Sequence, residues 1–424
     1  ETARAVAFVA LALARRPAAR DRSAPAARTE RLAAYLTAGG DREAAFAAYD
    51  RALELLPSTA TGDRARILAL LAQLRMLEGS FTEAERLAEA AMEAAEEAGP
   101  DARAWLGHAT CTRGVVDGWL GRNDAAIERL EAALAIAVDL GRLEDAFRAR
   151  ANLTTALALQ GRREEAVEVA RQGIAAAMAA GLEVVHGNAL RGNAAEFLVS
   201  LGRWREAREL AERALDWAPS GFLFVNAALR LATVEAETTA GDAAVRLLGR
   251  VLLELETVPD VQFAAPAYQA AASLALWRGD LADAVRSIEA AWARVRASED
   301  WAIAARTAAA GLAVADARAR VARERRDLAD LAGARAWADD VLRHATRMVE
   351  QSGAPADAWV RREVEADLAT ARAYAARLHG RDDPATWEAV AARWGALGRP
   401  YERARALHRL IEADLEAGHP AGER

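Results

Sequence analysis

The segment GNAAEFLVSLGRWREARELAERAL, residues 192–215, decides the fold. Its apolar residues recur at helical spacing on both sides of a Leu-Gly-Arg break, as expected for two amphipathic helices joined by a tight turn. The break glycine, Gly202, has counterparts at Gly40, Gly79, Gly121, Gly161, Gly241 and Gly279. The successive differences along this series are 39, 42, 40, 41, 39 and 38 residues. The chain is therefore predicted to be an array of α-hairpins with a period of about forty residues.

Small side chains mark where the two helices of each hairpin should meet. Most break glycines are followed five residues later by an alanine, at Ala45, Ala84, Ala126, Ala166, Ala207 and Ala284. Another small residue comes seven positions further on, at Ala52, Ala91, Ala133, Gly173, Ala214 and Ala291. Both sets lie on one helix face, where small side chains allow close backbone approach. After Gly241 the alanine comes early, at Ala244, so the second helix there is expected to be shortened or shifted.

The array is predicted to form one helical body over residues 1–424, with three regions. Regular repeats are expected over about residues 25–298, irregular longer helices over 299–380 and terminal helices over 381–418. The next comparable break after Gly279 is Gly333, and later helices are expected at residues 355–379, 384–397 and 401–417, the last closed by Gly418. The arginine-rich stretch at residues 318–326 is interrupted by carboxylates, which indicates a solvated helix with weak ion pairs.

Composition excludes several classes of function. The 55 basic residues are all arginines and the formal net charge is −7, so neither a lysine-dependent P-loop nor nucleic-acid binding through a global positive field is expected. The six histidines lack metal-ligand spacing, and the single cysteine, Cys111, permits no internal disulfide. No nucleophile constellation is present. We therefore expect no catalytic activity, no metal site and no cofactor.

The opening residues also bear on localisation. The longest apolar run near the start, residues 5–14, is shorter than the roughly 20 residues that a membrane span needs. The chain begins without Met and without a basic stretch before that run, so it makes a poor signal peptide and is interpreted as a cut inside a longer protein. A cytoplasmic setting without membrane contact is expected, and the single cysteine fits a reducing compartment.

Residues 151–166 resemble a tetratricopeptide repeat, although forty residues exceed the usual unit. The resemblance implies an all-α fold, a right-handed superhelix of stacked antiparallel helix pairs, with a concave inner wall lined by the first helix of each pair. The positions that face this wall in tetratricopeptide proteins predict ligand-binding residues at His108, Cys111, Trp119, Arg148, Thr155, Glu196, Ser200, Glu235, Thr238, Gln269 and Trp277. The same mapping selects Gly118, Leu159, Gly192, Thr239 and Ser273.

This wall favours a pocket for a small or polar organic ligand between Trp119 and Trp277. Arg148 is its only fixed cation, which argues against a clamp for acidic peptides. An ordinary solvated inner face that binds nothing stays open as the alternative. Asn152 and Asn193 share another register and are expected to hydrogen-bond to the backbone of a neighbouring helix, and most tryptophans are expected to fill the core.

A second resemblance covers most of the chain. From Glu30 onward the sequence resembles the helical-repeat sensor region of the large ATP-binding LuxR-type transcriptional regulators, which are signal-transduction ATPases with numerous domains. The stretches that carry it are RANLTTALALQGRREEA (150–166), GNAAEFLVSLGRWREA (192–207), VQFAAPAYQAAASLALWRGDLADA (261–284) and WGALGRPYERARALHRLIEADLEAG (394–418).

That resemblance implies a regulatory domain that senses a small-molecule inducer or a protein partner. It further implies a nucleotide-binding module before the array, a helix-turn-helix module after it, and self-association of the whole protein. Direct contact of this chain with nucleic acid is not expected. The alternative function is a protein–protein interaction scaffold without a small-molecule ligand, which a co-purifying partner would distinguish from a ligand sensor.

Overall fold

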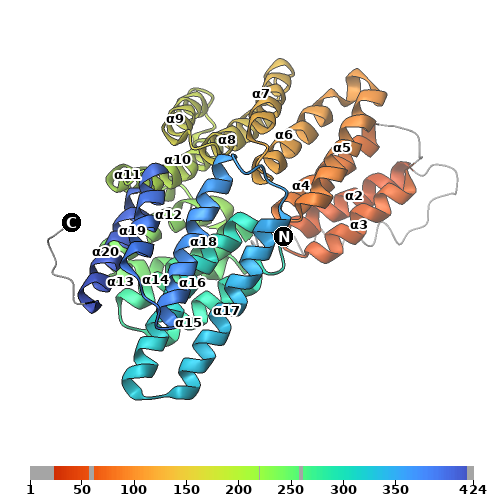
Figure 1. Cartoon of the computed structure of the whole chain (residues 1–424). Coiled ribbons are helices and arrows are strands. Elements are labelled where there is room, and N and C mark those ends of the chain that lie inside the picture. Colours follow the sequence, from red (N-terminus) through yellow and green to blue (C-terminus); the bar gives the residue numbers. More distant parts are fainter. Residues whose placement is uncertain (1–22, 57–61, 219, 257–260, 418–424) are drawn as a thin grey trace. The chain divides into compact units, whose positions relative to one another are not determined.

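The computed structural model describes residues 23–56, 62–218, 220–256 and 261–417. All regular secondary structure in these ranges is helical (Figure 1), which confirms the predicted all-α fold. Within the same ranges, no helix combines the length and the apolarity that crossing a membrane requires. The predictions for the opening segment and for Gly418 lie outside the described residues.

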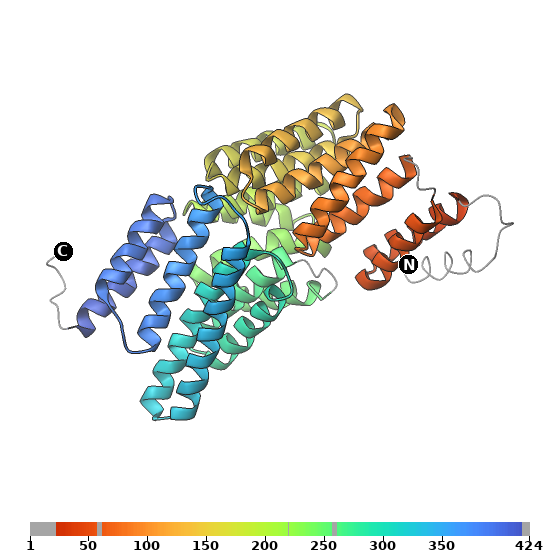
Figure 2. The same cartoon turned by 45° about the vertical axis from the view of Figure 1, so that its right-hand side comes forward.

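The chain divides into two compact units. Among the described residues, the first unit comprises 23–56, 62–118, 124–153 and 256, and the second comprises 119–123, 154–218, 220–255 and 261–417. Adjacent helices pack in antiparallel pairs within the units, as α4 with α5 in the first and α14 with α15 in the second (Figures 1 and 2). The single continuous body and the handedness of a superhelix stay predictions.

The helices follow the predicted hairpins closely. Those up to the middle of the chain are α2 (Ser23–Ala38), α3 (Arg42–Leu55), α4 (Gly62–Leu77), α5 (Phe81–Ala98), η1 (Pro100–Ala102), α6 (Arg103–Trp119), α7 (Asn123–Asp139), α8 (Leu143–Leu159), α9 (Arg163–Ala179), η2 (Glu183–Gly187), α10 (Asn188–Ser200) and α11 (Trp204–Leu215). The later ones are α12 (Gly221–Thr238), α13 (Asp242–Glu254), α14 (Val261–Trp277), α15 (Leu281–Val295), α16 (Trp301–Arg325), α17 (Leu328–Gln351), α18 (Trp359–Leu378), α19 (Pro384–Ala396) and α20 (Pro400–Glu416).

The turn between the helices of a hairpin needs a left-handed backbone conformation. Gly202 has a φ of 74°, and its amide donates a hydrogen bond of 3.0 Å to the Val199 carbonyl, which caps α10. The alanines five residues after the break glycines are all fully buried, as is Ala214 seven positions beyond Ala207. The small residues therefore lie where two helices touch, as their spacing predicts.

The turn before α13 differs from the others. Here the left-handed residue is Ala240, with a φ of 46°, whereas Gly241 has a φ of −82°. Helix α13 consequently begins directly after its break glycine, while α11 and α15 begin two residues after theirs. The shift predicted from the early Ala244 is thus present, and Ala244 is fully buried.

Ala240→Gly is expected to stabilise the protein by about 0.5–1 kcal/mol, because glycine removes the steric cost of a left-handed alanine. The greater flexibility of glycine in the unfolded chain offsets only part of this gain. The matched reverse change is Gly279→Ala in the next hairpin. Gly279 has a φ of 77° and no atom within 4 Å of an added Cβ, so that change isolates backbone strain and should destabilise. Urea unfolding of both variants measures the two signs, and a loss of stability in Ala240→Gly would contradict this account.

The region of longer, irregular helices is also present. Helices α16, α17 and α18 have 25, 24 and 20 residues, and α16 packs against both of the others (Figure 1). The predicted break at Gly333 is wrong, because Gly333 lies inside α17. The chain turns at Arg326 instead, which has a φ of 57°, and the Asp327 carboxylate caps α17 by accepting the Asp330 amide at 2.9 Å. Side-chain capping thus fixes this boundary without a glycine.

Candidate ligand cavity in the second unit

The second unit contains a cavity of about 260 Å³. Side chains from α10, α11, α12, α14, α16, α18, α19 and α20 line it, so it joins the regular hairpins to the terminal helices of the same unit. Its apolar wall comes from α14 and α16, where alanines leave room between the helices. Pro266, Leu276, Ala309, Ala313 and Val314 belong to that wall.

Aromatic side chains form the other side of the cavity. They are Trp204, Tyr374, Trp387, Trp394 and Tyr401. Trp387 and Trp394 are 1% and 3% exposed, so their rings belong to the core while one face reaches the cavity. Their indole N–H groups are already satisfied, at 2.8 Å by Asp382 for Trp387 and at 3.0 Å by the hydroxyl of the lining residue Thr370 for Trp394. The rings are therefore fixed apolar surfaces rather than free donors.

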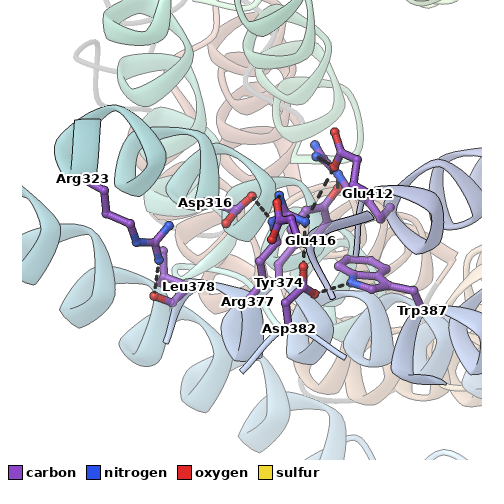
Figure 3. Close-up of polar contacts among 10 residues, drawn as sticks. Asp316, Arg323, Tyr374, Arg377, Leu378, Asp382, Trp387, Glu412 and Glu416 are labelled. Carbon is purple, nitrogen blue, oxygen red and sulfur yellow. Dashed lines mark hydrogen bonds and ion pairs between the residues drawn. The ribbon is translucent and has the colours of Figure 1, made fainter. Parts of the chain in front are cut away.

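A polar network around Arg377 holds the Trp387 ring in place (Figure 3). The Arg377 guanidinium on α18 bonds to Asp382 at 2.7 Å, and Asp382 accepts the Trp387 indole N–H. The same guanidinium pairs with Asp316 of α16 at 3.2 Å and with Glu416 of α20 at 3.0 Å. The network thus connects α16, α18 and α20 beside the aromatic wall.

Most charged groups of the cavity lining are paired. Glu196 and Arg230 form an ion pair at 2.8 Å between α10 and α12. Glu363 is 6% exposed and bonds to Arg163 and, at 3.4 Å, to Arg399. The same Arg399 side chain also bonds to Glu402, at the start of α20. Because these charges are compensated within the protein, we expect them to shape the cavity and to contribute little to its affinity for a ligand.

Glu237 of α12 is a second satisfied carboxylate. It accepts hydrogen bonds from the Ser273 hydroxyl at 2.6 Å, from the Trp277 indole N–H at 3.0 Å and from the Tyr401 hydroxyl. Burial and the nearby Glu237 charge both raise the pKa of Tyr401, so this hydroxyl stays protonated and keeps donating. Glu237 therefore ties α14 and α20 to α12.

Asp367 of α18 is the exception among the carboxylates. Its side chain lines the cavity with 8% of the residue exposed, and no side chain or amide of the described residues hydrogen-bonds to it. Burial raises the pKa of Asp367 to about 7, although Arg306 and Arg399 act in the opposite direction. The carboxyl group is accordingly about half protonated near neutral pH.

Two arginines of the lining also lack a carboxylate. Arg306 of α16 and Arg405 of α20 are exposed, and neither forms a hydrogen bond or an ion pair with any residue that the structure describes. The Arg405 guanidinium lies 5.9 Å from the centre of the Tyr401 ring. The cavity therefore has a buried acid and two available cations.

The structure brings only some of the predicted site residues to this cavity. Glu196, Ser200 and Gln269 line it, together with Ser273. Glu235 and Thr238 do not, because Glu235 pairs with Arg208 and the Thr238 hydroxyl donates to the Val234 carbonyl at 2.6 Å. Thr155, half-buried on α8, lies outside the lining.

The two tryptophans expected to face each other do not form the walls of the cavity. Trp277 is 64% exposed and bonds to Glu237. Trp119 packs against the core of the second unit, and its carbonyl accepts the Trp301 indole N–H at 2.9 Å. Aromatic side chains from the later helices, which the mapping did not reach, form the walls instead.

The remaining predicted residues lie in the first unit, where they satisfy one another. His108 lies 2.9 Å from the Gln73 amide oxygen, and burial, assisted by the Arg148 charge, lowers the pKa of His108 to about 4. Arg148 donates to the Thr112 hydroxyl at 2.7 Å. Asn152 donates to the Cys111 sulfur at 3.3 Å, which is a side chain of the neighbouring helix and not the backbone that was predicted. These contacts join neighbouring helices. Whether any predicted residue binds a ligand stays a prediction.

Sequence reasoning missed Asp367, Arg306 and Arg405. All three follow Gly279, where the forty-residue register is lost. One signal was available for Arg306, which is a lone charge in the alanine-rich run AIAARTAAAGLAVA, residues 302–315. No comparable signal marks Asp367, since a single carboxylate on an amphipathic helix is ordinary. In the part of the chain that the structure describes, no cluster of His, Cys, Asp and Glu is suited to a metal ion.

Comparisons with known proteins support the fold. No family model and no curated protein matches the sequence. Among solved structures, a Rap protein complexed with competence and sporulation factor is 13% identical, with a TM-score of 0.56, over 82% of this chain and 94% of that chain. The Rap conjugation gene regulator of plasmid pLS20, in complex with the Phr* peptide, is 15% identical, with a TM-score of 0.47, over 64% of this chain and 76% of that chain. At such identities the likeness shows the fold alone, and it confirms a tetratricopeptide-like helical-repeat architecture.

Proposed function

We propose that the chain is a regulatory sensor domain that binds a ligand in the cavity of its second unit. The observation that carries this proposal is Asp367, a buried carboxyl group without a hydrogen-bond partner among the described residues, in a cavity that also has available arginines. Leaving such a group unpaired costs free energy, which a ligand with complementary groups would recover. The Rap protein of similar fold is itself complexed with competence and sporulation factor.

A ligand in this position would act on two parts of the second unit at once. It would touch α10, α12 and α14 from the regular hairpins and α16, α18 and α20 from the later helices. A regulatory ligand shifts an equilibrium only by the difference in its affinity for the two states. Because the cavity is built from both groups of helices, a change in the spacing between the two groups would change its affinity for the ligand.

We further propose that the output is transcriptional, in a LuxR-type ATP-dependent regulator. This part of the proposal rests on the sequence resemblance over residues 30–424. Its test is the coding sequence on either side of this region in the parent gene. A P-loop module upstream and a helix-turn-helix module downstream are expected, and the lack of both would contradict it.

Ligand binding is tested by thermal unfolding of the full chain against a metabolite library. A ligand of the cavity should raise the melting temperature, and Ala309→Phe should abolish that shift because the added ring occupies the cavity next to α14. The matched control is Ala332→Phe on the exposed surface of α17, which should keep the shift. A shift that survives Ala309→Phe would place the ligand elsewhere. If no compound gives a shift and a protein partner co-purifies, the scaffold function is favoured instead.

A further inference from the structure

We propose that the cavity takes a small organic carboxylate, whose charged group pairs with Arg306 and Arg405 while its apolar body lies against α14 and α16. This inference rests on the proposed function and names the chemical class of the ligand. It follows from which charges of the lining are already paired, from the chemistry of arginine, and from the surfaces that surround the unpaired groups.

The first step is that the paired carboxylates of the lining already have partners within the protein and do not need a cationic ligand. Glu196 has Arg230, Glu363 has Arg163 and Arg399, and Glu402 has Arg399. Glu237 accepts three hydrogen bonds. A cationic ligand would therefore find only Asp367 as its counter-charge.

The second step concerns the two unpaired arginines. A guanidinium group keeps its positive charge at every physiological pH, so Arg306 and Arg405 stay cationic wherever the cavity meets a ligand. Neither has a carboxylate partner among the described residues, and both line the cavity. An anion with two oxygens is the group that a guanidinium binds best, through parallel charge-assisted hydrogen bonds.

The third step is that Asp367 tolerates an anion beside it. The charged groups that act on its carboxyl are Arg306 of α16, Glu363 of its own helix α18, Arg399 before α20 and Glu402 in α20. Because burial favours the protonated form, the carboxyl group can donate a hydrogen bond to a ligand oxygen. A bound anion favours that form further, so binding near neutral pH is expected to take up a proton.

The fourth step is the surface next to these groups. Ala309, Ala313 and Val314 on α16 and Pro266 on α14 offer apolar contact, and Trp387 and Trp394 offer ring faces. A volume of about 260 Å³ suits a small molecule. The body of the ligand is therefore expected to be apolar, and a single aromatic ring is a suitable probe.

The experiment uses three probes with the same body and different charge: 3-phenylpropionate, 3-phenylpropanamide and 3-phenylpropylammonium. Quenching of tryptophan fluorescence and isothermal titration calorimetry on the full chain measure their affinities. The carboxylate is expected to bind at least about tenfold more tightly than the amide or the amine. Equal or tighter binding of the amide or the amine overturns the inference, and so does a failure of all three at millimolar concentration.

Variants locate the charged group of the probe. Arg306→Gln and Arg405→Gln are each expected to weaken binding of the carboxylate about tenfold and to leave the amide unchanged. The matched control, Arg343→Gln on α17, removes an exposed arginine outside the lining and should change neither affinity. Equal effects of all three variants overturn the inference. If a library compound without an anionic group binds and Ala309→Phe abolishes its binding, the proposed function stands while this inference falls.

Discussion

We expect the difference in unfolding free energy between Asp367→Asn and the wild type to change by about 4 kcal/mol between pH 4 and pH 8. The pKa of Asp367 is raised by burial from 3.8 to about 7 in the folded protein. Between these two values the folded state binds more protons than the unfolded state, so the wild-type protein loses stability as the pH rises from about 4 to about 7. Above that range the penalty is constant. Asparagine carries no charge and therefore removes this loss.

The sign of the effect should reverse within the accessible pH range. At low pH the neutral aspartic acid costs little, and the unpaired asparagine amide makes the variant equal to or less stable than the wild type. At pH 8 the variant should be more stable, because the wild type then holds a buried carboxylate without a hydrogen-bond partner among the described residues.

Chemical unfolding at a series of pH values measures this difference. Asp300, which burial gives a pKa of about 6, titrates in the same window, but it does so in both proteins and cancels in the comparison. The matched control is Asp340→Asn on α17, where the carboxylate is exposed and lies 3.8 Å from Arg343. Parallel pH profiles for Asp367→Asn and the wild type would contradict the burial argument.

Gly161→Ala is the second large effect, and we expect it to destabilise the protein by about 2–5 kcal/mol. Gly161 has a φ of 79°, which an alanine adopts only with strain. An added Cβ would also lie 2.3 Å from the Trp359 ring, so the indole at the start of α18 would have to move. The two costs add because they arise from different atoms.

The control separates strain from overlap. Gly181 belongs to the same unit and has a φ of 68°, but an added Cβ there has no atom within 4 Å. Gly181→Ala is therefore expected to cost only about 1–2 kcal/mol. Denaturant midpoints of the two variants provide the comparison. Equal losses would show that Trp359 moves aside without cost.

The fold was largely predictable because its information is local. Each hairpin carries its own turn glycine and its own small residues, and these lie within a few turns of helix from one another. The failures have local causes as well. Arg326 takes a left-handed conformation without being glycine, and the Asp327 side chain caps the start of α17. The turn therefore lies before Gly333, which is inside the helix.

The cavity was much less predictable, because its contacts join distant residues. Arg163 and Glu363 are 200 positions apart, and Glu237 and Tyr401 are 164 apart. The forty-residue register relates neighbouring repeats only, so it placed Glu196, Ser200 and Gln269 on one wall and could not place the opposite wall. The identity of that wall depends on how α16, α18 and α20 pack, which no periodicity in the sequence specifies.

The bond between Glu237 and Tyr401 has a consequence for synthesis. A ribosome makes α12 and α14 long before it reaches residue 401, and nascent chains begin to fold from the N-terminal end. The Glu237 carboxylate therefore lacks its tyrosine donor until translation has passed that codon. Release of a truncated product before Tyr401 would leave Trp204 without the ring that packs on it at 4.9 Å, an exposed surface that quality-control proteases can recognise.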